Sequence, residues 1–117
     1  YGDKTHVSPL VKTLLDANIA VASVGYIYAG PDRTLMDLAR DCAKAVDKIL
    51  TIFPRFTRVV VSGHSAGGHL AYKCKCSSPH YSRVPLMKST KVTGVLPIAG
   101  AFDLREVWQD TYIGKEI

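Results

Sequence analysis

The pentapeptide G-H-S-A-G at residues 63–67 has the residue types and spacing of a site that could do chemistry. It follows the β-branched run 58–62 and precedes a helix-compatible stretch at 68–72. A strand, then G-x-S-x-G, then a helix is the layout of a nucleophile elbow, in which a serine on a strained turn exposes its Oγ. Gly63 and Gly67, two residues before and after the serine, are expected to let the backbone fold back without side-chain clashes.

Ser65 is the candidate nucleophile of this turn. A serine hydroxyl is a weak nucleophile unless a base takes its proton. The N–H of Ala66 is expected beside the developing oxyanion, at the positive end of the following helix. Gly67 and Gly68 are expected to let the helix and a substrate approach closely. His64 adjoins Ser65, but neighbours in such a turn point in different directions, so we expect it to pack or to form hydrogen bonds instead of acting as the base.

Other interpretations of these residues are a strand-to-helix turn without chemistry, a phosphate loop and a metal site. The phosphate loop is disfavoured because neither G-x-x-x-x-G-K-[ST] nor G-x-G-x-x-G occurs. The histidines and cysteines between residues 64 and 80 match no familiar zinc spacing. We therefore expect no metal and no cofactor.

Composition limits the class of protein. With 117 residues and 47% hydrophobic residues, the chain could form one soluble globular domain. No stretch approaches the ~18 apolar residues of a membrane span. The net charge of +5 comes from scattered basic residues, without the pattern of a nucleic-acid binder. The odd set of Cys42, Cys74 and Cys76 favours a reducing, intracellular compartment, and we expect Cys42 to be buried as a small hydrophobe.

Helix patterns recur along the chain. Ser8 and Pro9 are typical of a helix start, and Asn18 is expected to end that helix. Thr34 and Asp37 resemble a capping box, and an apolar face follows them. The predicted helices are 8–18, 34–53 closed by Pro54, about 66–75, and a short one that begins with residues 103–106.

Three segments, 19–26, 57–62 and 92–99, are predicted as strands, and 77–88 as a loop. The first is apolar at odd and even positions alike, so we expect it to be buried on both faces. Alternating helices and strands predict an α/β fold, with a parallel sheet and helices on both faces. Since three strands leave the outer edges unpaired, the sheet is expected to need further strands.

Residues 63–71 resemble the elbow of kynurenine formamidases (arylformamidases), in the hormone-sensitive-lipase-like branch of the α/β-hydrolases. Residues 24–35 are similar to the "GY…AP…TL" segment before that family's long helix, with Gly30 added before the proline. Residues 98–104 are similar to its "SG-x-YDL" segment. The resemblance therefore spans the chain from about residue 19 to 109.

The resemblance implies a partial α/β-hydrolase fold and a small-molecule substrate. The implied reaction is hydrolysis of N-formyl-L-kynurenine to kynurenine and formate, a cytoplasmic step of tryptophan breakdown. Ser65 would be the nucleophile and Ala66 N–H one oxyanion donor. No membrane or nucleic-acid partner is expected, and the full-length protein could be a homodimer. A general carboxylesterase of the same fold and a truncated, non-catalytic chain remain as alternatives.

The catalytic set is incomplete in this chain. In α/β-hydrolases the order is Ser, then Asp or Glu, then His. His80 is the only histidine after the predicted helix 66–75, and it precedes the later acids Asp103, Glu106, Asp110 and Glu116. The resemblance places an upstream His-Gly-Gly oxyanion loop before Tyr1, and the triad acid and histidine after Ile117. Residues 1–117 are therefore expected to be the central part of one domain, inactive alone.

Overall fold

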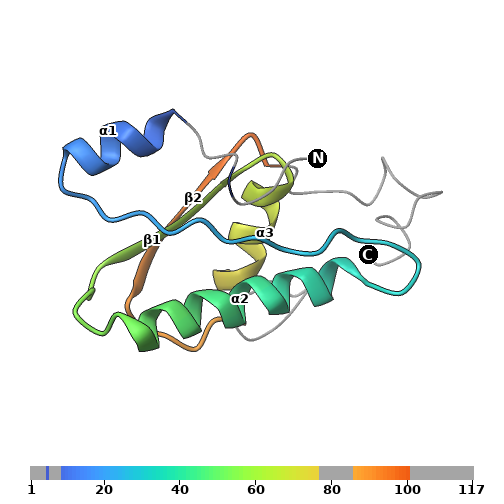
Figure 1. The fold of residues 1–117 in the computed structure, drawn as a ribbon. Helices are drawn as coiled ribbons and strands as arrows, with labels where there is room; N and C mark the ends of the chain where they lie inside the picture. The colour runs from blue at the N-terminus through green and yellow to red at the C-terminus, as the bar shows by residue number, and fades with distance from the viewer. Residues whose placement is uncertain (1–4, 6–8, 77–85, 101–117) are drawn as a thin grey trace.

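The computed structural model describes residues 5, 9–76 and 86–100, which form three helices and two parallel strands. The elements in chain order are α1 (Leu10–Asp16), α2 (Leu35–Ile52), β1 (Val59–His64), α3 (Ala66–Lys75) and β2 (Val92–Ile98) (Figure 1). The predicted α/β class with a parallel sheet is confirmed for these residues. The helix expected at 103–106 and most of the loop expected at 77–88 lie outside the described residues.

Helix α2 begins at the predicted capping box. Thr34 Oγ1 accepts a hydrogen bond from Asp37 N–H (3.1 Å), and Asp37 Oδ2 accepts one from Thr34 N–H (3.0 Å). The bond from Thr34 N–H is the main cause that lowers the pKa of the Asp37 carboxyl group. The Thr34 hydroxyl, which donates to the same oxygen (2.8 Å), lowers it further. The helix ends at Ile52 with Phe53 as its C-terminal cap. Pro54, the next residue, has no N–H and therefore cannot continue the helix. Both predicted ends of this helix are confirmed.

Helix α1 is short and exposed. Pro9 has helical dihedral angles just before the first helical residue, while Ser8 lies outside the described residues. Asn18, with φ of 58°, follows the last turn in the left-handed conformation that often ends helices. The predicted end is therefore confirmed. Leu10 and Leu15 are exposed, Val11 and Leu14 are partly buried, and no residue of α1 is fully buried.

The strand predicted at residues 19–26 is wrong. The segment runs from α1 to a turn at Gly30–Arg33 without forming helix or strand (Figure 1). Ile19 is 50% exposed and Ile27 is 63% exposed. A strand exists only where a neighbour accepts and donates its backbone hydrogen bonds. Among the described residues the only sheet consists of β1 and β2, so this apolar segment has no ladder to join.

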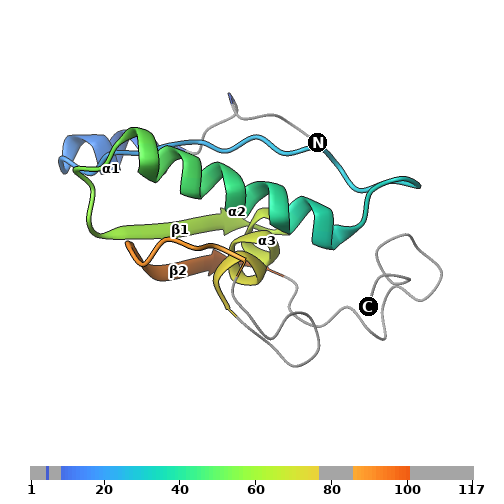
Figure 2. The same cartoon turned by 90° about the horizontal axis from the view of Figure 1, so that it is seen from below.

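The core lies on one face of the sheet. Val59 and Val61 of β1 pack against a buried cluster that comes mainly from α2 and α3. Helix α3 contacts both strands and also packs against α2, and the two views show these helices side by side (Figures 1 and 2). The buried members of the cluster are Leu35, Leu38, Ala39, Ala43, Leu50, Leu70, Cys74, Met87 and Val92.

The opposite face of the sheet is open. Val60, Leu96 and Ile98 are 60%, 54% and 41% exposed, because alternate residues of a strand point to opposite faces. The prediction of helices on both faces therefore differs from the described structure, in which α2 and α3 share one face. Helix α1 does not close this face either, since Val60, Leu96 and Ile98 remain exposed there.

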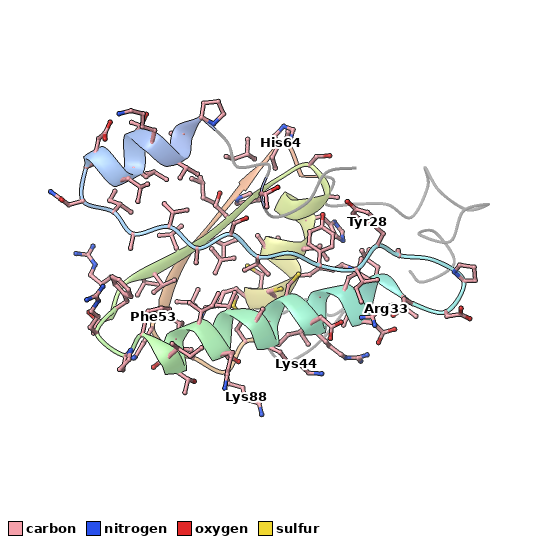
Figure 3. The ribbon with its side chains drawn as sticks, viewed as in Figure 1. Tyr28, Arg33, Lys44, Phe53, His64 and Lys88 are labelled. Atoms are coloured by element: carbon pink, nitrogen blue, oxygen red, sulfur yellow. The ribbon has the colours of Figure 1, made fainter. Side chains whose placement is uncertain are left out.

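A set of polar contacts fixes the start of β2. Asp47 of α2 accepts hydrogen bonds from the backbone N–H groups of Lys88 (2.9 Å) and Ser89 (3.0 Å). Lys91 Nζ donates to the carbonyl oxygen of Pro54 (2.9 Å). Figure 3 shows Lys88 at the end of the molecule opposite His64. These contacts hold the entry to β2 at the end of the sheet away from the Ser65 turn.

We expect the 117-residue chain, expressed alone, to aggregate. In the described structure the outer edges of β1 and β2 are unpaired and one sheet face is apolar, two features that promote association between chains. Size-exclusion chromatography with light scattering measures the association state of the chain. Threonine at Val60 and Leu96 should raise the soluble fraction, since it keeps β-propensity and removes apolar area.

The matched control replaces Leu10 and Leu15 of α1 by glutamine. These leucines are about as exposed but lie outside the sheet, so this pair of changes should raise solubility less. A soluble monomer of the unmodified chain with a cooperative thermal transition would contradict the prediction.

Candidate active site

Ser65 occupies the turn between β1 and α3, at the carboxyl ends of both parallel strands. Its φ of 53° and ψ of −119° are unfavourable for a residue with a side chain. Two backbone hydrogen bonds hold this conformation: Ser65 N–H donates to Ile98 O (2.9 Å), and Ser65 O accepts from His69 N–H (3.1 Å). The residue is exposed. A strained, exposed serine between a strand and a helix is the geometry predicted from G-x-S-x-G.

Two glycines make this turn sterically possible. A Cβ added at Gly63 would lie 2.3 Å from both the carbonyl carbon and the oxygen of Gly67. A Cβ added at Gly68 would lie 2.9 Å from Gly63 O and 3.1 Å from Ile98 O. Since every one of these neighbours is a backbone atom, no side-chain movement could relieve the clash.

Gly67 differs from the expectation for it. A Cβ built at this position meets nothing within 4 Å, so the lack of a side chain at residue 67 is not what permits the turn. Its backbone is what Gly63 approaches. The turn therefore requires the absence of a side chain at Gly63 and Gly68. The G-x-S-x-G pattern names Gly67 instead, which is the residue directly before Gly68.

The start of α3 offers hydrogen-bond donors beside Ser65. The first backbone bond that closes this helix runs from His69 N–H to Ser65 O, and the N–H groups before it have no intrahelical acceptor. The Ser65 side chain makes no capping hydrogen bond. Ala66 is exposed and is the first residue of α3, so its N–H lies at the positive end of the α3 dipole next to the serine. This arrangement can stabilise an oxyanion that forms on a carbonyl attacked by Ser65.

His64 is exposed at the end of β1, where it lies opposite Ile98 in the sheet register. Figure 3 shows it at the tip of the strand. We expected His64 to pack or to form hydrogen bonds. It does not pack, because the sheet face on which it lies has no covering helix in the described structure, and the hydrogen-bonding alternative stays a prediction. Ser62, on the same face, donates through Oγ to the carbonyl oxygen of Leu96 (2.8 Å).

Two polar side chains are buried on α3 beyond the turn. His69 and Lys73 are 4% and 5% exposed, and their i, i+4 spacing puts them on one helix face. Burial lowers the pKa of Lys73 to about 8. Sequence reasoning missed this lysine, because a basic residue in the last turn of a helix is usually solvated there.

The structure brings together residues 63–68, and in the parts of the chain that it describes no candidate triad base lies beside them. His80 and the acids of residues 103–116 lie outside the described residues. In the described ranges no group of three or more His, Cys, Asp or Glu side chains could hold a metal ion.

Comparisons of the chain with protein families, curated proteins and solved structures find no match. None of the helices in the described part of the chain is long and apolar enough to cross a membrane.

Alanine substitutions should separate the glycines of the turn. Gly63→Ala and Gly68→Ala should each lower the free energy of unfolding by about 3 kcal/mol or more, because the new Cβ meets backbone atoms. Gly67→Ala is the matched control: it has space, and should be neutral or stabilising by up to about 1 kcal/mol through helix propensity. Urea unfolding of the longest soluble form of the protein measures the differences. Equal effects at the three positions would contradict the observed packing.

Proposed function

We propose that this chain carries the nucleophile of a serine hydrolase, with Ser65 as the attacking residue and Ala66 N–H as an oxyanion donor. The observation that carries the proposal is the backbone of Ser65, whose φ of 53° places an exposed serine between β1 and α3. Strain of this kind costs about 1–3 kcal/mol and is retained chiefly at functional sites. A turn without chemistry would avoid that cost with glycine at this position.

The proposed reaction is acyl transfer to Ser65. Oγ attacks the carbonyl carbon of an amide or ester while a base takes the hydroxyl proton. The resulting oxyanion accepts a hydrogen bond from Ala66 N–H at the positive end of α3. When the intermediate collapses, the leaving amine or alcohol takes the proton, and water then releases the acyl group from Ser65. One oxyanion donor contributes about 3–4 kcal/mol to such a step.

We further propose that the chain is the central part of an α/β-hydrolase domain. The parallel pairing of β1 with β2 and the turn from β1 into α3 support this architecture. The open sheet face and the unpaired strand edges in the described structure also support it, since further elements would cover them. The base and the acid of the triad would then come from chain that flanks these elements.

The substrate that we propose is N-formyl-L-kynurenine, hydrolysed in the cytoplasm without a cofactor. Support comes from the resemblance of residues 24–35, 63–71 and 98–104 to arylformamidases. The first of these segments contains the Gly30–Arg33 turn and the Thr34 cap of α2, and the second contains the Ser65 turn. A general carboxylesterase is the second candidate, because the same turn serves ester hydrolysis.

A fluorophosphonate probe should label the full-length protein at Ser65 alone, because such probes capture a serine that a base and an oxyanion hole activate. Ser65→Ala should abolish labelling and leave folding intact. Ser62→Ala is the matched control: this exposed serine lies three residues earlier, and its hydroxyl is bonded to Leu96 O, so labelling should persist.

Mass spectrometry of the labelled peptide gives the readout. Labelling that survives Ser65→Ala would place the nucleophile elsewhere. Absence of labelling in the unmodified full-length protein would favour the non-catalytic alternative.

Substrate preference should separate formamidase from carboxylesterase. The full-length enzyme should show a higher kcat/KM for N-formyl-L-kynurenine than for short aryl esters, because binding of the amino-acid and aromatic groups orients the small formyl group over Ser65. A carboxylesterase pocket would gain mainly by burying the acyl chain, at roughly 0.8 kcal/mol per CH₂. The kcat/KM values for formylkynurenine and for a series of esters from acetate to octanoate distinguish the two enzymes. A steady gain with acyl length and no formylkynurenine hydrolysis would leave the carboxylesterase.

A further inference from the structure

Cys42 and Cys74 come from different helices and meet in the core. Cys42 lies on α2 and Cys74 on α3, and both are free thiols in this structure. Cys74 is 1% exposed, whereas Cys42 is partly buried and packs against the same cluster. Cys76, the third cysteine, lies just beyond the end of α3 and is partly exposed.

The sulfur of Cys74 lies against one turn of α2. Its Sγ donates to the carbonyl oxygen of Ala39 at 3.2 Å, and it also interacts with the backbone of Ala43. Both alanines are buried, with 0% and 1% exposure, and their small side chains let α3 approach α2 closely. Cys42 belongs to the same helical turn, so the close approach brings the two thiols together.

The two thiols interact directly. A hydrogen bond from the Cys74 thiol is the main cause that lowers the pKa of Cys42, and the same contact is the main cause that raises the pKa of Cys74. The Cys74 thiol thus lies within hydrogen-bonding reach of both the Ala39 carbonyl oxygen and the Cys42 sulfur. Cys42 is therefore both the more acidic and the more accessible of the two, which is the character of a cysteine that oxidants attack.

We propose that Cys42 and Cys74 form a reversible disulfide that joins α2 to α3 when a hydroperoxide oxidises Cys42. The Cys42 thiolate attacks one oxygen of the peroxide, an S–O bond forms as the O–O bond breaks, and hydroxide leaves from hydrogen peroxide. Cys74 then attacks the sulfenic sulfur, the S–S bond forms, and the hydroxyl group leaves with the Cys74 proton as water. Two thiols and one peroxide thus give one disulfide and two waters.

The crosslink acts on the segment that carries Ser65. Because it joins residues 42 and 74, the closed loop contains the end of α2, all of β1, the Ser65 turn and nearly all of α3. A disulfide restricts the unfolded chain across such a loop. Oxidation should therefore protect this segment against local unfolding without a change at the turn itself.

The test is thiol mapping of the longest soluble form of the protein after stoichiometric hydrogen peroxide. Free thiols are alkylated and the protein is digested with trypsin without reduction. Because cleavage after Lys73 and Lys75 separates Cys74 from Cys76, the peptides identify the bond. We expect a Cys42–Cys74 peptide pair lighter by two hydrogens than the two reduced peptides, an alkylated Cys76, and loss of the pair on treatment with dithiothreitol.

Variants and a denatured control make the outcome decisive. Cys42→Ser and Cys74→Ser should each abolish the crosslinked pair, and Cys76→Ser, the matched control, should keep it. In denaturing urea the pairing should shift toward Cys74–Cys76, the cysteines nearest in sequence. Native crosslinking that involves Cys76, an unoxidised Cys42, or the same pairing with and without urea would overturn the proposal.

Discussion

The described structure depends on how closely the backbone of β1 approaches the start of α3. Gly63 lies so near Gly67 and Gly68 that no Cβ fits between them. This contact sets the angle at which the chain leaves the strand, and it forces Ser65 into its positive φ. Once that angle is set, α3 lies across both strands and against α2. The buried core and the exposed serine are thus two results of one backbone contact.

The same arrangement makes the molecule one-sided. The strand β1 sends Val59 and Val61 toward the helices and Val60 away from them. On the covered side of the sheet, the small side chains of Ala39 and Ala43 let α2 approach α3 closely. Cys74 Sγ of α3 can therefore donate to the Ala39 carbonyl oxygen of α2. Tight packing on one side and apolar exposure on the other are typical of part of a layered α/β domain.

Local patterns were the predictable part of this fold. The Thr34–Asp37 capping box and Pro54 define α2 because a helix start and a helix end depend on neighbouring residues. The turn at Ser65 was also predictable, since its glycines act within a few residues. The segment 19–26 was not, because apolar β-branched residues form a strand only beside a partner that no local pattern reveals.

The burial of Lys73 could not be predicted from the sequence either. Lys73 is buried because α3 packs with that side inward, and no pattern in its own helix marks this. What the sequence could show was the form of the turn, and what it could not show was the set of side chains brought to it.

Asp47 has a consequence for the register of the sheet. Its carboxylate binds the amides of Lys88 and Ser89 just before β2, and the other end of β2 supplies the Ile98 carbonyl that accepts from Ser65 N–H. A slip of β2 by one residue would turn Leu96 inward and present a different carbonyl to Ser65. The seven residues of β2 span about 23 Å. Asp47 therefore helps to determine, from the opposite end of the sheet, which carbonyl of β2 holds the backbone of the serine.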